Sequence, residues 1–278
     1  GISRPATKHN YLVKNSKNLC KIVHEAFDIA SNGRPGPVLI DLPKDIQFDQ
    51  VFYEKKNIFK NSFTNYNNTF NQEIIEKTAE LLVKAKKPII YGGGGIINSG
   101  PEASMILRNI VKELNVPVTL TLMGLGAIPH NDSNFLGMLG MHGTYEANLA
   151  MHHCDVMLNV GARFDDRVTG RLDAFSPNSK KIHIDIDESN INKTIKVDVP
   201  VVGDVTSVLT KVVKVWKDKQ LNTNEIDIKK WWDKINNWKK IDCLHFTKNE
   251  KEIKPQYAIQ RLYELTKERT KYKGGILP

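Results

Sequence analysis

The sequence predicts an α/β protein whose centre is a doubly wound, Rossmann-like parallel sheet of about six strands. Between residues 71 and 220, short runs rich in β-branched residues alternate with amphipathic helix patterns, which is typical of parallel strands joined by helices. The runs are 88–91, 116–121, 155–160, 181–186 and 199–202. Glycines and charged residues follow several of them, where an open α/β sheet binds its ligands. We therefore expect a ligand-binding domain in the middle of the chain.

The segments on either side of this centre differ from it in character. The first 45 residues contain one amphipathic helix pattern and one strand run, 38–42, and these are too few elements to cover a sheet. We interpret 1–45 as the carboxyl-terminal remnant of a preceding α/β domain, and Gly1 in place of an initiator methionine agrees with this. The other expected segments are a linker at 46–70, the central domain at 71–220 and a helical extension at 221–278.

The central domain is expected to open with an amphipathic helix that Asn71 caps. The apolar face predicted for this helix consists of Ile74, Thr78, Leu81, Leu82 and Ala85. The pattern of 205–216 predicts the last helix that covers the sheet.

Beyond residue 220 the chain is rich in lysine, with large apolar residues at helical spacing. These residues are Ile228, Trp231, Trp232, Ile235 and Trp238. Tryptophans among lysines could stack on bases or lie on a membrane, but so regular a period favours a helix packed on its own protein. A final helix is expected at 255–271.

Composition narrows the classes of function. The formal net charge is +9, but the lysines are scattered and accompanied by many asparagines, which indicates a composition bias and not a nucleic-acid-binding surface. No run approaches the ~20 apolar residues that cross a bilayer, and no leader is apparent, so we expect a cytoplasmic protein that binds neither membrane nor nucleic acid. The three widely spaced cysteines suggest neither a disulfide framework nor a zinc site.

The most informative segment is 160–170, Val-Gly-Ala-Arg-Phe-Asp-Asp-Arg-Val-Thr-Gly, directly after the apolar run 156–158. It places four charged residues at the carboxyl end of an expected buried strand: Arg163, Asp165, Asp166 and Arg167. A solvated loop could carry these charges, but it would have little reason to interleave Phe164 and Val168 between glycines. A ligand-binding role is the favoured interpretation.

Other strand ends carry further candidates, each with a structural alternative. Gly92–Gly95 could let the backbone approach a phosphate, or could form a bare tight turn. Asp185 and Asp187 could accept hydrogen bonds from ribose hydroxyls, or could be turn residues. Asp204 is well placed to cap the helix that follows, which is compatible with a ligand contact.

His142 precedes a helix that Thr144 is expected to cap. A metal site is disfavoured because His152 and His153 lie on that helix and no second ligand has usable spacing. Stacking against a planar ring, such as a flavin, or a helix-cap hydrogen bond would both suit this histidine.

Two basic residues near residue 40 are also candidates. Arg34 is held by a short turn before its strand, so its guanidinium suits a phosphate or carbonyl oxygen, with a simple ion pair as the alternative. Lys44, with Asp45, follows the same strand and could line a cleft or be solvated.

Four stretches, 31–45, 121–126, 136–144 and 159–170, together resemble the catalytic (large) subunit of the acetohydroxyacid synthase (acetolactate synthase) family. Their order and spacing match over roughly residues 1 to 220. The family has three α/β domains, which bind the pyrimidine of thiamine, FAD and the diphosphate of thiamine. The resemblance implies that this chain is the end of the first, all of the second and the lead-in to the third.

The resemblance also implies an activity for the full-length parent. The family condenses two pyruvates to 2-acetolactate with loss of CO2, or pyruvate with 2-oxobutyrate to 2-aceto-2-hydroxybutyrate, in the first common step of branched-chain amino-acid synthesis. Thiamine diphosphate with Mg²⁺ carries the chemistry, and FAD has no net redox role. A homodimer or homotetramer and a regulatory small subunit are implied as partners.

The FAD pocket implied by the resemblance draws on all the strand-end loops. It consists of Arg34, Gly94, Thr121, Leu122, Leu139, Gly140, Met141, His142, Gly161, Ala162, Arg163, Phe164, Asp165, Asp166, Arg167, Asp185, Ile186, Asp204 and Val205. The implied substrate channel, where herbicides also bind, includes Lys44, Met141, Asp166 and Arg167.

We expect neither catalytic residues nor metal ligands in this chain. The resemblance implies that the glutamate that activates thiamine precedes residue 1 and that the Gly-Asp-Gly metal motif follows Pro278, so the chain alone is expected to be inactive. Two alternatives stay open: another thiamine enzyme, such as a pyruvate oxidase or glyoxylate carboligase, and a stand-alone FAD- or NAD-binding module.

Overall fold

The computed structural model describes residues 1–52, 71–248 and 251–271, with side-chain placement as far as residue 267. The chain divides into two compact units, Gly1–Thr69 and Phe70–Pro278, and each is described by itself. Most of the predicted linker, 46–70, lies outside the described residues. Among the helices of the described segments, none has the length and apolar character needed to span a membrane.

The first unit is a two-stranded parallel sheet with one connecting helix. Strand β1 (His9–Leu12) pairs with β2 (Val38–Asp41), and α1 (Leu19–Ser31) joins them. Short helices at Arg4–Ala6 and Ser16–Asn18 and helix α2 (Lys44–Phe48) complete it. Strand β2 was predicted, whereas β1 was not, because a run of four residues with polar members gives no clear alternation. Few side chains are buried in this unit, Val13 and Ala26 among them.

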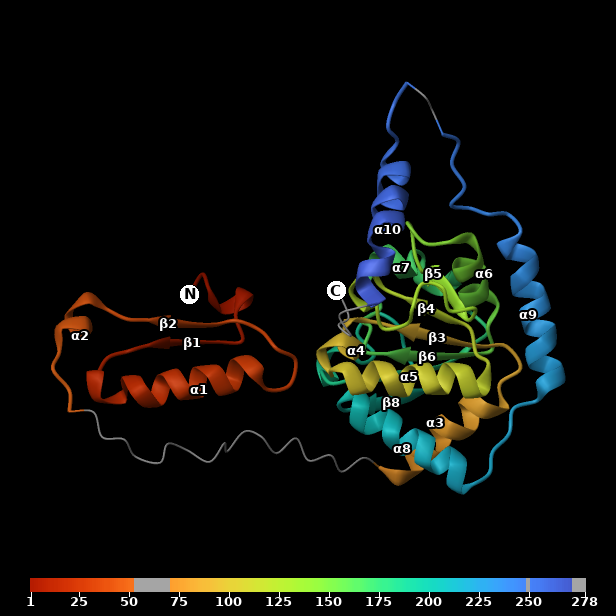
Figure 1. The fold of residues 1–278 in the computed structure, drawn as a ribbon. Coiled ribbons are helices and arrows are strands. Elements are labelled where there is room, and N and C mark those ends of the chain that lie inside the picture. The colour runs from red at the N-terminus through yellow and green to blue at the C-terminus, as the bar shows by residue number, and fades with distance from the viewer. Residues whose placement is uncertain (53–70, 249–250, 272–278) are drawn as a thin grey trace. The chain divides into compact units, whose positions relative to one another are not determined.

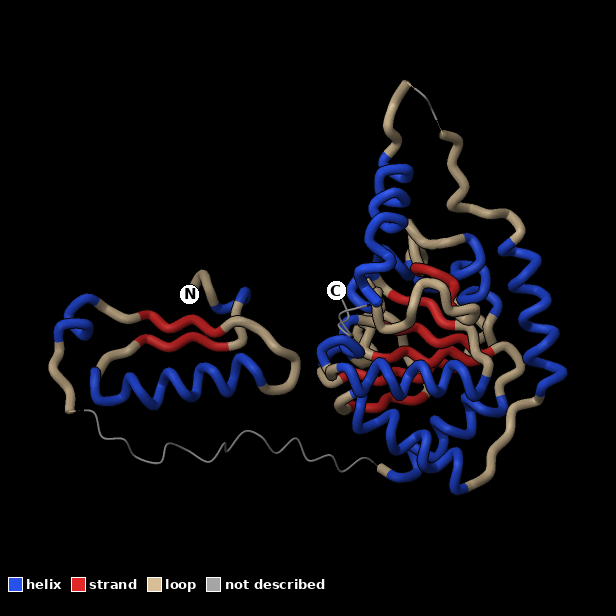
Figure 2. The backbone as a smooth tube through the Cα atoms, viewed as in Figure 1, coloured by secondary structure: helices blue, strands red, loops and turns tan. Residues whose placement is uncertain are grey.

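The second unit contains a six-stranded parallel sheet in the order β5-β4-β3-β6-β7-β8 (Figures 1 and 2). The strands are β3 (Pro88–Gly92), β4 (Val118–Leu120), β5 (Phe135–Met138), β6 (Val156–Val160), β7 (Lys180–Asp185) and β8 (Val199–Val202). The chain builds outward from β3 to β5, returns to the centre at β6 and builds outward again to β8. This is the doubly wound order, which confirms the predicted fold class.

Helices cover both faces of this sheet (Figure 1). Helices α3 (Gln72–Lys84), α5 (Pro101–Leu114) and α8 (Val205–Asp218) cover one face, and α6 (Tyr145–His153) and α9 (Glu225–Lys239) cover the other. The remaining helices are α4 (Gly94–Asn98), α7 (Asp166–Thr169) and α10 (Pro255–Lys271), with short 3-10 turns at Leu122–Gly124, Leu172–Ala174 and Glu188–Asn190.

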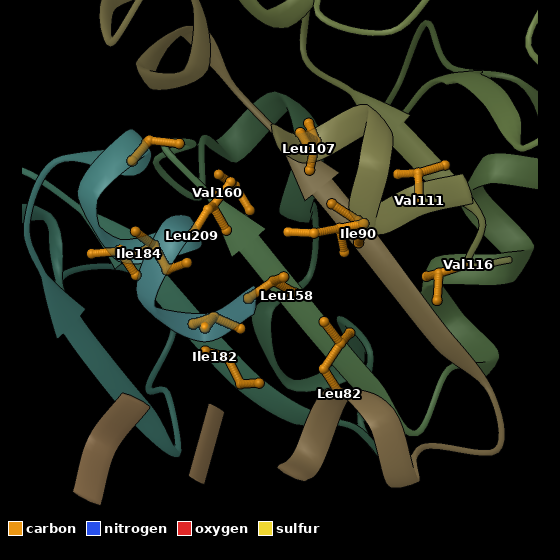
Figure 3. Packing of buried hydrophobic residues seen from close by; sticks show 14 of the residues in the cluster. Leu82, Ile90, Leu107, Val111, Val116, Leu158, Val160, Ile182, Ile184 and Leu209 are labelled. Atoms are coloured by element: carbon orange, nitrogen blue, oxygen red, sulfur yellow. The ribbon is translucent and has the colours of Figure 1, made fainter. Parts of the chain in front are cut away.

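The larger core lies between the sheet and the layer of α3, α5 and α8. Ile90, Leu158 and Ile182, from three neighbouring strands, meet Leu107 and Leu209 from the helices (Figure 3). Each of the five is completely buried. Burial of side chains of this size contributes roughly 1.5–3 kcal/mol each, so this core holds the central strands at fixed positions.

Helix α3 buries a wider face than the predicted one. Ile75, Ala79 and Val83 are buried together with the predicted Thr78 and Leu82. Ile74 and Leu81 are only half-buried and pack at the margin of the core. Ala85, just after the helix, is 5% exposed, so the predicted face is confirmed at Thr78, Leu82 and Ala85. The buried stripe is wider than predicted because α3 packs on both α8 and β8.

The tryptophans of α9 pack on the domain itself, which confirms the favoured interpretation of this helix. Trp231 is 1% exposed, and its Nε1 donates to the Pro88 carbonyl at 3.0 Å. Trp232 donates to the Asn115 carbonyl at 2.8 Å. The Trp238 ring lies 5.8 Å from the Trp231 ring and stacks on His153 at 5.6 Å.

We predict that Trp231→Ala lowers the free energy of unfolding of the second unit by about 3–5 kcal/mol, because it leaves a cavity and a carbonyl without its donor. Ile226→Ala, on the same helix but 66% exposed, should change it by less than about 0.5 kcal/mol. Urea unfolding followed by circular dichroism measures both. Equal effects of the two substitutions would contradict the packing of α9.

Candidate functional site at the carboxyl edge of the sheet

The loops after four parallel strands bring the predicted residues to one edge of the sheet. Gly94 follows β3, His142 follows β5, Arg163 follows β6 and Asp185 ends β7. The two halves of the sheet meet between β3 and β6, the point at which the direction of strand order reverses. Ligands of open α/β sheets bind outside the carboxyl ends of the strands at this point.

Glycines let the loops after β3, β4 and β6 touch through their backbones. A Cβ on Gly93 would lie 2.4 Å from the Gly161 carbonyl oxygen, and one on Gly95 would lie 2.6 Å from the Gly161 Cα. A Cβ on Gly124, after β4, would lie 2.7 Å from the Gly92 carbonyl oxygen. The tight-turn interpretation of the Gly92–Gly95 run is therefore sufficient to explain glycine at Gly93 and Gly95.

The charged loop after β6 is fastened to its own strand by a buried asparagine. Asn159 is completely buried on β6, where most neighbours are apolar. Its Nδ2 donates to the Ala162 carbonyl at 2.6 Å, and its Oδ1 accepts from the Ala162 N–H at 3.1 Å. These two bonds turn the backbone back over the sheet at Gly161, whose φ is +61°.

Phe164 anchors the same loop in the core. Its ring lies 5.1 Å from the His183 ring, 5.9 Å from Phe175 and 6.3 Å from Tyr91. Phe164 itself is only 4% exposed. Burial raises the pKa of the Tyr91 hydroxyl, and the nearby Asp165 charge raises it further, so this phenol stays neutral beneath the loop.

The charged residues beside Phe164 face outward. Asp165 caps α7 by accepting from the Arg167 N–H at 3.1 Å and pairs with Arg163 Nη2 at 2.9 Å. The pKa of Asp165 lies below its usual value, chiefly because of the hydrogen bond from the Arg167 backbone. The side chains of Asp166 and Arg167 are exposed. The loop thus presents a fixed cap and two arginines to solvent.

The loop after β5 is joined to the β6 loop through the backbone. The Met141 N–H donates to the Arg167 carbonyl at 3.0 Å, and Asn148 bonds both the N–H and the carbonyl of Gly140 at 3.0 Å. The expected helix cap is confirmed, because Thr144 Oγ1 accepts from the Ala147 N–H. Met141, which is 65% exposed, and the neighbouring His142 both project away from the core.

The loop after β4 adds exposed apolar side chains at this edge. Leu122 is 70% exposed and Met123 is 74% exposed, and the Met123 Cβ is the atom nearest to a Cβ built on Gly94. Thr121 accepts from the Gly124 N–H at 3.1 Å and shapes this turn. Exposed apolar groups beside arginines suit a ligand that has both a planar ring and negative charge.

The acidic candidates at the far half of the sheet have structural partners. Asp185, 7% exposed, accepts from the Asp187 N–H at 2.8 Å, and half-buried Ile186 follows it. Asp204 caps α8 by accepting from the Ser207 N–H at 3.0 Å, and its other oxygen accepts from Ser99. The predicted cap is thereby confirmed, and a ligand contact by Asp204 stays a prediction.

Several predicted pocket residues have side chains in the core: Leu139, Ala162, Phe164 and Val205. A ligand would reach them only through their backbones. Arg34 and Lys44 are exposed residues of the first unit. Sequence reasoning missed Asn159 and His183, although a polar residue inside an apolar strand run was a signal for each. Within the described segments, no cluster of three or more metal-binding side chains occurs.

Comparison of the sequence with known proteins identifies the family to which this domain is similar. The sequence profile of the family described as the thiamine pyrophosphate enzyme central domain matches residues 75–212. An acetolactate synthase large subunit from Buchnera aphidicola subsp. Schizaphis graminum is 48% identical over 271 residues, and one from Haemophilus influenzae is 44% identical over 269. The isozyme 3 large subunit of Escherichia coli is 42% identical over 274 residues. The alignments cover 96% of this chain but only 46% of each relative.

The doubly wound sheet and its strand-end loops are those of a thiamine pyrophosphate enzyme central domain. Sequence identities of 42–48% to acetolactate synthase large subunits over nearly the whole chain narrow the family assignment further. The chain belongs to the acetolactate synthase large-subunit family, and it spans somewhat less than half the length of these relatives.

We predict that Asn159→Ala frees the β6 loop from the sheet. It should lower the free energy of unfolding by about 2–3 kcal/mol, because two backbone groups lose buried partners, and it should speed tryptic cleavage after Arg163 and Arg167. Asn98→Ala, in an exposed position of α4, is the control and should change neither measurement. Unchanged cleavage despite lower stability would show that the asparagine does not hold the loop.

Proposed function

We propose that this chain is the central part of an acetolactate synthase large subunit. As part of the whole protein it would serve the thiamine-diphosphate-dependent condensation of two pyruvates to 2-acetolactate with release of CO2, or of pyruvate with 2-oxobutyrate. The observation that carries the proposal is the charged loop Arg163–Arg167, which Asn159 attaches to the sheet at its switch point. The similarity to acetolactate synthase large subunits, which extends over 96% of this chain, supports it. We expect the protein to be cytoplasmic.

The proposal assigns a part to each segment. Residues 1–45 would be the end of the pyrimidine-binding domain, 46–70 a linker, 71–220 the central domain and 221–278 the lead-in to the diphosphate-binding domain. The β1-α1-β2 unit supports the first assignment, because a two-stranded sheet with one helix leaves Leu12 and Leu39 exposed. Dimeric or tetrameric assembly and a regulatory small subunit belong to the proposal for the whole protein.

FAD fits the chemistry of the carboxyl edge. Arg163 and Arg167 offer guanidinium groups to a diphosphate, and Asp185 has lone pairs left for ribose hydroxyls. Leu122 and Met141 offer apolar surface to a planar ring. Thiamine diphosphate with Mg²⁺ would supply the carbanion chemistry from groups elsewhere in the whole protein, and FAD would be held without net redox change.

The other members of the proposed FAD pocket fall into two groups. Gly94, Thr121, Gly140, His142, Gly161 and Ile186 lie in the strand-end loops of the second unit, whereas Arg34 would be contributed by the first unit. His142 is exposed and would stack on a planar ring. The substrate channel would combine Lys44 with Met141, Asp166 and Arg167, with the Arg167 guanidinium directed at the carboxylate of a 2-oxoacid.

We predict that this chain, transplanted in place of the aligned part of the Escherichia coli isozyme 3 large subunit, gives a yellow protein that forms acetolactate from pyruvate. The 278-residue chain alone, given pyruvate, thiamine diphosphate and Mg²⁺, should form none, because it covers only 46% of the length of the relatives that bear the name and thiamine must be positioned and activated for the reaction. Flavin absorbance and acetolactate are measured in both. A folded chimera that binds no flavin, or turnover by the chain alone, would contradict the proposal.

We predict that Arg167→Lys in this chimera raises the KM for pyruvate by about tenfold while leaving flavin content nearly unchanged, because lysine keeps the charge but loses the planar fork. Arg171→Lys is the matched control: Arg171 is exposed and pairs with Asp173 at 2.7 Å, outside the charged loop. It should leave KM unchanged. If Arg167→Ala showed unaltered kinetics, the loop would be only a solvated turn.

A further inference from the structure

His183 is a completely buried polar residue that the site described above does not use. It lies on β7, two residues before Asp185, and alternate residues of a strand project from the same face. Accordingly, its Nε2 lies 3.6 Å from Asp185 Oδ2, longer than a hydrogen bond but close enough for an electrostatic interaction. His183 therefore sits directly beneath the candidate ribose-binding carboxylate.

The same ring supports the charged loop. It meets Phe164 edge to face, with ring centroids 5.1 Å apart and an interplanar angle of 68°. The strand register places Tyr91, Asn159 and His183 in one row across β3, β6 and β7, and Phe164 contacts the rings at both ends of this row. One imidazole thus contacts the anchor of the β6 loop and the carboxylate at the end of β7.

An apolar side chain would fill this position with less loss of solvation energy. Within the described residues, neither ring nitrogen of His183 has a hydrogen-bond partner, and burial of such groups is unfavourable. The imidazole of His183 has a function at this position if it helps to keep the Asp185 carboxylate in place at the end of β7. Asp185 holds one oxygen on the Asp187 N–H and receives a 3.3 Å bond from Asn190 on the other, so His183 is its third polar neighbour.

We infer that His183 is a positioning residue for dinucleotide binding: its ring holds the Asp185 carboxylate and the Phe164 anchor in one geometry, so that the loops after β6 and β7 bind one ligand together. The inference rests on the proposed FAD site. His183 itself would not touch the ligand. It acts through Asp185, whose free lone pairs accept the ribose hydroxyls.

A double-mutant cycle on FAD affinity tests the inference. His183→Phe keeps the ring that packs on Phe164 but removes both nitrogens, and Asp185→Asn removes the charge. In the 278-residue chain, with FAD binding followed by flavin fluorescence and folding checked by circular dichroism, His183→Phe should weaken FAD binding about tenfold. In the Asp185→Asn background the same change should have almost no further effect, because its partner is gone.

His183→Gln keeps a nitrogen near the position of Nε2 and should restore FAD affinity to within about threefold of the unsubstituted chain. It also provides the test if His183→Phe fails to fold. Independent effects of His183 and Asp185, or a folded His183→Gln variant that binds as weakly as His183→Phe, would overturn the inference and leave the FAD site intact. An unsubstituted chain that binds no FAD would instead overturn the proposed site itself.

Discussion

The candidate site depends on the attachment of one loop to the sheet from which it emerges. Asn159 bonds both backbone groups of Ala162, and Phe164 inserts between Tyr91 and His183. The backbone can turn back over the sheet after β6 only because Gly161 adopts a positive φ and because Gly93 and Gly95 have no side chains to collide with it. Remove this attachment, and the charges of the loop would have no fixed relation to the sheet.

This attachment separates buried from exposed residues within a few positions. Ala162 and Phe164 face the core, whereas Arg163, Asp166 and Arg167 face solvent. The charged groups therefore avoid the cost of burial, while the apolar neighbours supply the rigidity. The Met141 N–H bond to the Arg167 carbonyl extends the same rigidity to the β5 loop, so exposed apolar and cationic groups share one frame.

The sequence was sufficient for features that repeat and insufficient for features that depend on contacts between distant residues. Alternating runs predicted the doubly wound sheet, and the spacing of Trp231 and Ile235 predicted a helix packed on its own domain. Strand β5 was not predicted because its four residues include Gly137 at a φ of +87° and its register with β4 is irregular. The roles of Asn159 and His183 could not be predicted, since each is set by a partner that only the folded sheet brings near.

The glycine run shows why a motif alone could not decide between two chemistries. Glycine before a helix suits both a phosphate cradle and close backbone packing, and the first turn of α4 already uses two of its N–H groups within the chain: Gly95 donates to the Gly161 carbonyl and Ile96 to the Gly93 carbonyl. An anion at this edge would then find fewer backbone donors than the motif suggests. In the proposed FAD site, the guanidinium groups of Arg163 and Arg167 would therefore take the electrostatic role that a glycine-rich turn serves in simpler dinucleotide sites.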